Sequence, residues 1–157
     1  MSEGHTVIAH IDGGSRGNPG PAAAAGVLLD EQGHRAEFSL FLGTTTNNVA
    51  EYVALIWALE EARRVGAEQL HVYTDSQLLA CQIQGSYRVK STHLQALHRQ
   101  ARELERAFRQ VRVCYVPREE NRVADAMVNR TLDLAVRYLA VHLPAAKTPF
   151  PLEPQPE

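Results

Sequence analysis

The first forty residues consist of short apolar stretches separated by polar connections, a pattern typical of β-strands and turns. Such stretches cover residues 6–12, about 22–30 and about 35–42. The connections between them, GGSRGNPGP and DEQGH, contain glycine, asparagine and proline residues that favour turns. Because connections this short join neighbouring strands in opposite directions, the pattern predicts an antiparallel three-stranded meander.

From Asn48 to Val65 the apolar positions recur with the period of a helix, and Gly66 ends the pattern. The rest of the chain switches between short apolar runs and helical spacing. It predicts a strand at 70–74, a short helix at 75–85, a longer helix marked by apolar residues from Leu94 to Phe108, a strand at 111–116 and a last helix from about Val123 to His142.

This order of elements predicts an α/β fold with a mixed five-stranded sheet. A strand that follows a helical crossover runs parallel to its neighbour, so three antiparallel strands should be followed by two parallel ones, with helices flanking the sheet. A chain of 157 residues suits one such domain. We expect it to occupy residues 1–143, followed by a disordered tail over residues 144–157, where five of the eight prolines lie.

The composition indicates a globular protein of the cytoplasm. Hydrophobic residues make up 45% of the chain and charged residues 22%, which is typical of a packed domain. No apolar run approaches the roughly 18 residues that a membrane span needs, and the N-terminus does not resemble a signal peptide, so we expect no membrane partner. Cys81 and Cys114 are isolated, so we expect them to be small buried apolar residues and to form neither a disulfide nor a zinc site.

The charge is unevenly distributed along the chain. The net charge is −2, but the stretch from Ser86 to Arg112 carries seven basic residues against two acidic ones. A basic segment in an otherwise acidic protein can hold a polyanion such as a nucleic acid, and it can equally be a solvated helix face. Charge alone leaves both interpretations open.

Four acidic residues at the ends of predicted elements are the candidates for catalysis: Asp12, Glu51, Asp75 and Asp125. Taken singly, Asp12 fits a turn, Glu51 fits a capping box with Asn48, and the other two fit helix starts. Taken together they converge, because the first and fourth strands should be neighbours and the first and last helices can reach the same edge. Clustered carboxylates need cations, and oxygen ligands suit Mg²⁺ or Mn²⁺. Two such ions about 3.5–4 Å apart promote phosphodiester hydrolysis, which is the expected chemistry.

Four segments of the sequence resemble the signature segments of type 1 ribonuclease H. They are DGGSRGNPGPA at 12–22, TTNNVAEYVAL at 45–55, YTDSQL at 73–78 and VPREENRVADAMVNR at 116–130. The resemblance spans about residues 6–140 and implies a ribonuclease H-like fold. It also implies an endonuclease that hydrolyses the RNA strand of RNA/DNA hybrids with two Mg²⁺ ions, for which Mn²⁺ can substitute, leaving 3′-hydroxyl and 5′-phosphate ends. We expect this enzyme to be a monomer.

The resemblance assigns roles to individual residues. It implies that the metal ions are held by Asp12, Glu51, Asp75 and Asp125. It places the contacts to the hybrid at Asn18, Asn47 and Asn48, with Ser15 and Gln77 as further candidates. Amide side chains can donate hydrogen bonds to base edges and to the ribose 2′-hydroxyl groups that distinguish RNA from DNA. Asparagines are also typical of turns and helix caps, and both interpretations can hold at once.

The sequence departs from the family pattern in two places. Many members carry a basic, tryptophan-rich protrusion where this chain has only QGSYRVKSTHL, so Arg88 and Lys90 are candidates to hold a phosphate of the DNA strand in its place. The segment VPREEN also lacks the histidine that better-known members use in proton transfer or product release, which makes Arg118 the candidate substitute. The alternative for Arg118 is an exposed side chain paired with Glu119 or Glu120.

Two other functions stay open at the level of the sequence. A related nuclease would use the same metal chemistry on DNA or on double-stranded RNA, and a module without catalysis would only bind hybrids. The segments NNVAEY and GGSRGNPG argue against the first alternative, and the four acids argue against the second.

Overall fold

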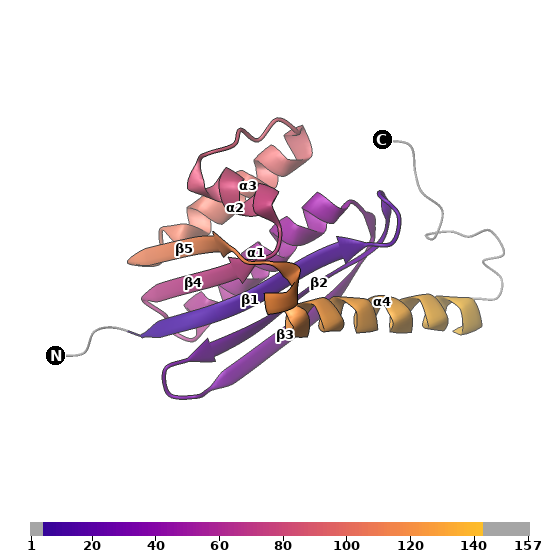
Figure 1. The fold of residues 1–157 in the computed structure, drawn as a ribbon, viewed down its shortest axis with the longest axis horizontal. Helices are drawn as coiled ribbons and strands as arrows, with labels where there is room; N and C mark the ends of the chain where they lie inside the picture. The colour runs from indigo at the N-terminus through magenta and orange to yellow at the C-terminus, as the bar shows by residue number, and fades with distance from the viewer. Residues whose placement is uncertain (1–4, 143–157) are drawn as a thin grey trace.

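The computed structural model describes residues 5–142, and a mixed five-stranded sheet forms its centre. The strands are β1 (Thr6–Ser15), β2 (Gly20–Asp30), β3 (Arg35–Thr45), β4 (Gln69–Thr74) and β5 (Gln110–Tyr115), in the spatial order β3-β2-β1-β4-β5 (Figure 1). β2 runs antiparallel to β1 and β3, whereas β4 runs parallel to β1 and β5. The predicted mixed sheet is therefore confirmed.

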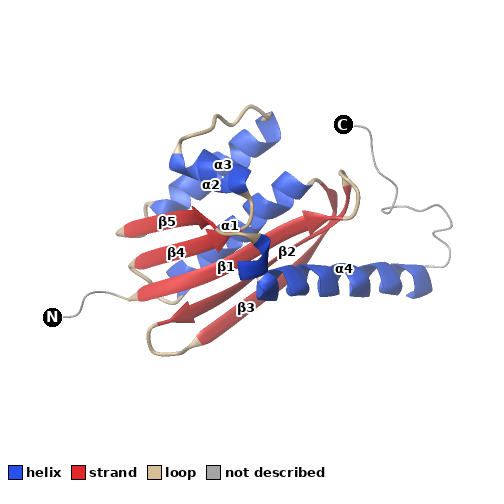
Figure 2. Cartoon of the chain, viewed as in Figure 1, coloured by secondary structure: helices blue, strands red, loops and turns tan. Residues whose placement is uncertain are grey.

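Helices cover both faces of this sheet, as predicted (Figure 2). They are α1 (Asn47–Arg64), α2 (Gln77–Gln84), α3 (Thr92–Glu105) and α4 (Arg122–His142), with a short 3-10 helix η1 (Arg118–Glu120) before α4. α1 packs on β1 and β2, and α3 packs on α1, so these two helices form successive layers on one side. α4 lies on the other side, against β1, β2 and β3.

Several element boundaries differ from the prediction, and two of these differences have a clear physical reason. β1 continues to Ser15, because Gly13, Gly14 and Ser15 keep pairing with alanines of β2 where a turn was expected. α3 ends at Glu105, and Phe108 follows it in the turn toward β5 while its side chain stays buried. A buried residue in the turn after a helix continues the apolar spacing of that helix, so the spacing alone does not show where the helix ends.

Small side chains allow β2 to be covered on both faces. The four alanines of residues 22–25 are fully buried. Alternate alanines pack with Val128 and Leu132 of α4, whereas Ala24 belongs to the main core between the sheet and α1. Successive side chains of a strand point to opposite faces. The helices on the two faces of the sheet, α1 and α4, can therefore both pack closely against β2.

Three further predictions concern the C-terminal tail, membrane-spanning helices and the two cysteines. The predicted tail over residues 144–157 lies outside the described residues. Within residues 5–142, no helix combines the length and the apolar character that a membrane crossing requires. Cys81 and Cys114 are free thiols, and both are half-buried, whereas the sequence predicted buried side chains.

Candidate active site

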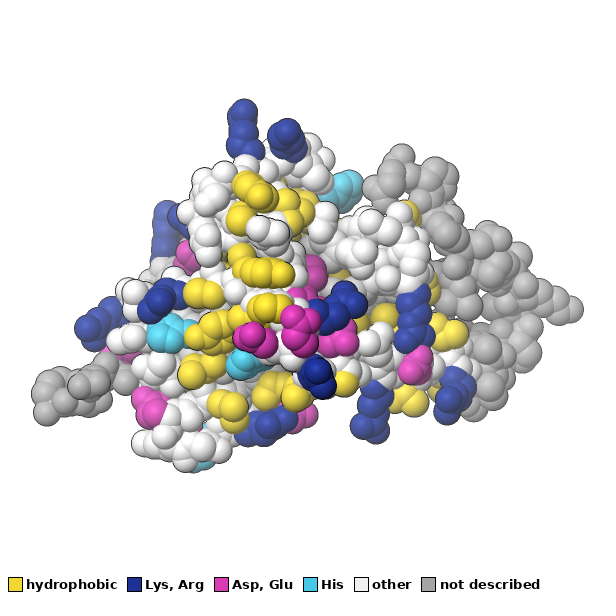
Figure 3. All heavy atoms as spheres, viewed as in Figure 1, with side chains coloured by type: hydrophobic (Ala, Val, Ile, Leu, Met, Phe, Trp, Pro, Cys, Tyr) yellow, Lys and Arg dark blue, Asp and Glu magenta, His cyan; other side chains and the backbone are white. Residues whose placement is uncertain are grey.

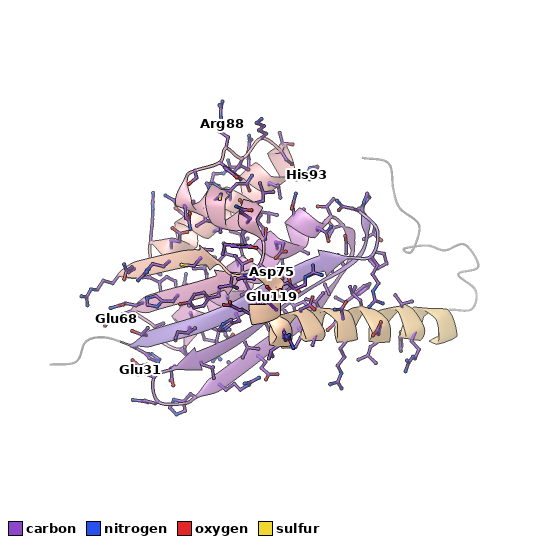
Figure 4. All side chains as sticks on the ribbon, in the orientation of Figure 1. Glu31, Glu68, Asp75, Arg88, His93 and Glu119 are labelled. Atoms are coloured by element: carbon purple, nitrogen blue, oxygen red, sulfur yellow. The ribbon has the colours of Figure 1, made fainter. Side chains whose placement is uncertain are left out.

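Three of the four candidate acids meet at one edge of the sheet. Asp12 lies on β1, Glu51 on α1 and Asp75 directly after β4, and oxygen atoms of the three carboxylates all lie within 4.8 Å of one another. β1 and β4 are parallel neighbours in which Ile11 pairs with Thr74, so the residue that follows in each chain segment emerges at the same edge. Figure 4 labels Asp75 where β4 ends.

Glu51 reaches the sheet because β1 passes very close to α1. A Cβ atom at Gly13 would lie 2.3 Å from the carbonyl carbon of Ala50, so only glycine fits between the strand and the helix. The Gly13 N–H donates to Glu51 Oε1 at 3.1 Å and so directs the carboxylate toward Asp12. The cap of α1 is Thr46, whose side chain accepts a backbone N–H of the first turn. The capping-box alternative for Glu51 is therefore wrong.

Asp75 lies beside the guanidinium group of Arg118. Arg118 Nε lies 3.8 Å from Asp75 Oδ2, and this buried oxygen has no hydrogen-bond partner among the described residues. Ser76 caps α2, so the alternative that Asp75 caps this helix is wrong. Arg118 is 78% exposed, and within residues 5–142 it forms no ion pair with Glu119 or Glu120. The arginine thus lies at the rim of the acidic cluster.

Asp125 lies in the first turn of α4 and is half-buried. It is not one of the three carboxylates that fall within 4.8 Å of one another. Its charge is nevertheless close enough to raise the pKa of both Asp12 and Asp75. An acid in the first turn of a helix also interacts favourably with the positive end of the helix dipole, so the position of Asp125 is compatible with the structural interpretation as well as with the functional one.

Burial and mutual repulsion favour protons on this cluster. Asp12 is 6% exposed, and its desolvation, together with the charges of Asp75 and Asp125, raises its pKa to about 8. Burial, followed by the charges of Asp12 and Asp75, raises the pKa of Glu51 well above its ordinary value. Burial also raises the pKa of Asp75, although a hydrogen bond with Asp12 and the charge of Arg118 oppose the shift. Figure 3 shows acidic side chains gathered at the centre of the visible face, beside basic ones. Carboxylates in this arrangement are stabilised by protons or by cations.

Three of the candidate hybrid contacts form one hydrogen-bonded unit at the end of β1. The N–H of Ser15 donates to Asn47 Oδ1 at 2.8 Å, and the N–H of Asn47 donates to Asn18 Oδ1 at 3.0 Å. Both amide oxygens are thus occupied, whereas neither side-chain NH₂ group has an acceptor within residues 5–142. Asn48 and Gln77 are exposed in the first turns of α1 and α2.

Arg88 and Lys90 lie on the link of residues 85–91 that joins α2 directly to α3. Figure 4 shows Arg88 away from Asp75. Both side chains are exposed. Arg88 lines an open hollow of about 550 Å³ together with Arg99 and Arg102. Several guanidinium groups around one hollow suit a phosphate-bearing ligand. The structure therefore places Arg88 at a second, basic region rather than beside the acids, and Lys90 lies on the same link.

Asn121 was not among the predicted site residues, yet it is 1% exposed and lies between η1 and α4. Its side-chain Nδ2 donates to the carbonyl oxygen of Ile11 at 2.7 Å, directly before Asp12. The only signal in the sequence is an asparagine just before a helix, which is typical of an N-cap and indicates no link to β1.

Comparisons with known proteins agree with this geometry. A family model described as reverse transcriptase-like matches residues 10–131. The bifunctional protein Rv2228c of Mycobacterium tuberculosis is 40% identical over 143 residues, which cover 90% of this chain and 39% of that protein. Ribonuclease HI of Halobacterium salinarum is 43% identical over 131 residues, which cover 83% of this chain and 66% of that protein. The chain thus spans about two fifths of the length of the mycobacterial relative.

Solved structures resemble the chain over most of its length. The N-terminal RNase H domain of Rv2228c superposes with a TM-score of 0.80. The match covers 84% of this chain and 96% of that domain's chain. RNase H1 of Halobacterium salinarum has a TM-score of 0.78 at 43% identity, with 82% of this chain and 98% of that chain covered. LC11-RNase H1, solved in complex with an RNA/DNA hybrid, has a TM-score of 0.78 at 39% identity. The match covers 83% of this chain and 99% of that chain. This chain therefore belongs to the family of reverse transcriptase-like domains and, within it, to the type 1 ribonucleases H.

Proposed function

We propose that this chain is an endoribonuclease that hydrolyses the RNA strand of RNA/DNA hybrids and leaves 3′-hydroxyl and 5′-phosphate ends. The observation that carries the proposal is the group of buried carboxylates on β1, on α1 and after β4, whose oxygens converge within 4.8 Å. Further support comes from LC11-RNase H1, which has the same fold and whose structure contains an RNA/DNA hybrid.

The acidic cluster fits divalent cations such as Mg²⁺, which Mn²⁺ can replace. Asp12, Glu51 and Asp75 offer only oxygen ligands, and Asp125 adds a fourth carboxylate nearby. The buried Asp75 Oδ2 has no hydrogen-bond partner among the described residues, as expected for an atom that binds a cation. Oxygen-only sites are typical of hard cations. Two ions bound there would supply an activated water and stabilise the leaving oxygen of a phosphodiester.

Main-chain groups of the protein hold these carboxylates in place. The Gly13 N–H binds Glu51, and the parallel pairing of β1 with β4 fixes the chain at Asp12 and Asp75. Without a cation, the raised pKa of Asp12 keeps a proton on this group at neutral pH. The Asp12 carboxyl group would have to lose that proton to hold a cation, so we expect the affinity of the cluster for metal to rise with pH.

Arg118 acts on the scissile phosphate. A guanidinium group stays protonated at any working pH, so Arg118 cannot be a general base. From its exposed position beside Asp75 it can bind a phosphate oxygen and stabilise the charge that develops there. It can also assist release of the 5′-phosphate product. Arg118 would thereby replace part of the role of the histidine that is missing from VPREEN.

The asparagine unit at the end of β1 reads the minor groove of the hybrid. The NH₂ groups of Asn18 and Asn47 can donate to base acceptors and to 2′-hydroxyl groups, because their amide oxygens are already occupied. Ser15 orients Asn47 through its N–H. Asn48 and Gln77 extend the same surface along the first turns of α1 and α2.

Arg88 and Lys90 hold phosphates of the DNA strand at a distance from the cleavage site. Their exposed side chains lie on the link 85–91, and Arg88 lines the basic hollow together with Arg99 and Arg102. Phosphate contacts of this kind contribute affinity that weakens with salt and does not depend on base sequence.

A cleavage assay on four labelled substrates tests the proposal: RNA/DNA hybrid, double-stranded DNA, double-stranded RNA and single-stranded RNA, each with and without Mg²⁺ or Mn²⁺. The protein is expected to cut only the RNA strand of the hybrid, and only with metal. Asp75→Asn removes a ligand charge at constant volume and should abolish cleavage, whereas Asp133→Asn, an exposed acid on α4, should not. Cleavage of DNA, or hybrid binding by the wild type without cleavage, would contradict the proposal.

The proposal extends to the organisation of the protein. Residues 1–143 would form the catalytic domain, which would act as a monomer in the cytoplasm. The solved RNase H1 structures are covered over 98% and 99% of their own chains, which supports an independent catalytic unit in this segment. Light scattering of the purified chain tests the oligomeric state, and a stable dimer would contradict this part.

A further inference from the structure

The segment between β5 and α4 is attached to the sheet at two main-chain carbonyl groups. The N–H of Val116 donates to the carbonyl oxygen of Thr74 at 2.8 Å. Nδ2 of Asn121 donates to the carbonyl oxygen of Ile11 at 2.7 Å. Thr74 and Ile11 are register partners, and each directly precedes an acid of the cluster. Both attachment points therefore lie one residue away from a candidate metal ligand.

Asn121 connects this attachment to the two functional side chains of the segment. Its N–H donates to the carbonyl oxygen of Arg118 at 2.8 Å, and its own carbonyl oxygen accepts the N–H of Asp125 at 3.1 Å. With the side-chain bond to Ile11, Asn121 uses three polar groups to contact three parts of the site. A displacement of Asn121 would therefore move Arg118 and Asp125 together relative to Asp12.

The side chain of Asn121 serves this connection rather than the start of α4. An asparagine before a helix usually accepts a backbone N–H of the first turn with its Oδ1. Here Oδ1 is buried and has no partner among the described residues. The reverse orientation of the amide would place two oxygen atoms against each other at Ile11. Because a buried unpaired acceptor is unfavourable, the bond to Ile11 explains the observed orientation and helix capping does not.

We propose that Asn121 is a positioning residue of the reaction, which holds Arg118 and Asp125 at a fixed place relative to Asp12. The inference rests on the function proposed above, because it requires these three side chains to act on metal and phosphate. Asn121 itself is buried and touches the site only through main-chain groups of its neighbours.

The test compares Asn121→Ala and Asn121→Ser with the wild type and with Gln84→Ala. Gln84→Ala is the control for the loss of a side-chain bond to the sheet, because Gln84 Nε2 also donates to a strand carbonyl group, that of Val113, at 2.8 Å, from a more exposed side chain. Serine is a good N-cap residue that is too short to reach Ile11, so Asn121→Ser keeps the start of α4 and loses the bond. Four quantities are measured: the thermal midpoint, hybrid affinity in chelator, kcat on the hybrid, and the Mg²⁺ concentration for half-maximal activity.

Both Asn121 variants are expected to lower kcat about 10- to 100-fold and to raise the Mg²⁺ concentration for half-maximal activity. Hybrid affinity in chelator should stay almost unchanged, because the asparagine unit of β1 and the basic link are untouched. A merely structural role would reduce the folded fraction without changing the Mg²⁺ dependence of the folded molecules. Gln84→Ala should accordingly leave both kinetic quantities at their wild-type values.

Wild-type kcat and Mg²⁺ dependence in the Asn121 variants would overturn the proposal, as would equal changes in Gln84→Ala. Failure of both Asn121 variants to fold would assign the residue a structural role and overturn it as well. The proposed function is judged separately. It fails if the wild type does not cut the hybrid, or if Asp12→Asn cuts it as the wild type does.

Discussion

Asp12→Asn is expected to stabilise the metal-free protein while it abolishes cleavage. Burial and the charges of Asp75 and Asp125 raise the pKa of Asp12 from 3.8 to about 8, so the folded protein takes up a proton that the unfolded chain lacks at neutral pH. Asparagine keeps the size of the side chain and carries no charge. The substitution therefore removes an unfavourable contribution to the free energy of folding, and it removes a proposed metal ligand from the site.

The magnitude follows from the raised pKa. At pH 7 the unfolded chain has Asp12 ionised, because its ordinary pKa of 3.8 lies roughly three units below the pH, whereas the folded protein holds the proton. At about 1.4 kcal/mol per unit, this difference lowers the free energy of unfolding of the wild type by about 4 kcal/mol. The amide of asparagine is still desolvated at this buried position, so we expect the variant to recover about half of this loss, about 2 kcal/mol. In a domain of this size, this gain raises the thermal midpoint by about 4–8 °C.

The pH dependence has a definite sign. The pKa of Asp12 is higher in the folded than in the unfolded state, so the native protein binds more protons between about pH 4 and pH 8. The free energy of unfolding therefore falls as pH rises through this window, and it should fall less steeply in Asp12→Asn. Added Mg²⁺ should narrow the gap between the two proteins, because a cation takes the place of the proton in the wild type.

Thermal unfolding in chelator at several pH values, followed by the same series with Mg²⁺, measures this effect. Asp133→Asn is the matched control, since Asp133 is 60% exposed and pairs with Arg16 at the surface. Its shift should stay within about 1 kcal/mol. An Asp12→Asn midpoint at or below that of the wild type in chelator at pH 7 would refute the electrostatic reasoning. Near-wild-type cleavage by Asp12→Asn would refute the assignment of Asp12 as a ligand.

Three further sets of substitutions test other parts of the site. Arg88→Ala combined with Lys90→Ala should raise KM several-fold and weaken the salt dependence of KM with little change in kcat, because phosphate contacts supply uniform, salt-sensitive binding. An unchanged KM and an unchanged salt dependence would leave both residues without a role in binding. Gly13→Ala should lower the thermal midpoint strongly, because the Cβ of the new alanine would lie 2.3 Å from the carbonyl carbon of Ala50. A midpoint equal to that of the wild type would show that β1 and α1 can move apart without cost. Arg118→Ala should lower kcat about 100-fold, well beyond any change in KM. Arg118→Lys should recover part of this loss, because lysine restores the positive charge. Wild-type kcat in Arg118→Ala would exclude the residue from the mechanism.

The arrangement of the strands was predictable from the sequence for physical reasons. Short connections require antiparallel neighbours, and helical crossovers require parallel ones, so the order of elements left few possible sheets. The observed order β3-β2-β1-β4-β5 is among them. The same rule implied that Asp12 and Asp75 lie near each other, because parallel neighbours end at one edge of a sheet.

The contacts that orient the site were not predictable in this way. Glu51 and Asn121 both bind main-chain groups of β1, which are the same for every residue type and leave no pattern in the sequence. The spacing of Asn48 and Glu51 predicted a local partner for the carboxylate. The close approach of α1 to Gly13 supplied a distant partner instead, and that approach depends on the packing of the whole helix.

Residues 11–13, in the second half of β1, are the common reference for the acidic cluster. Main-chain groups of residues 11–13 bind the side chain of Glu51, bind Asn121 before α4, and pair with the end of β4. Side-chain substitutions do not remove main-chain groups, so the geometry of the cluster tolerates changes around it unless the strand itself moves. Gly13→Ala is such a change, because it separates β1 from α1 and shifts several acids at once, whereas Asp12→Asn alters one charge within an intact frame. The two variants should therefore differ in the sign of their stability change: Asp12→Asn gains stability in chelator, and Gly13→Ala loses stability together with metal binding.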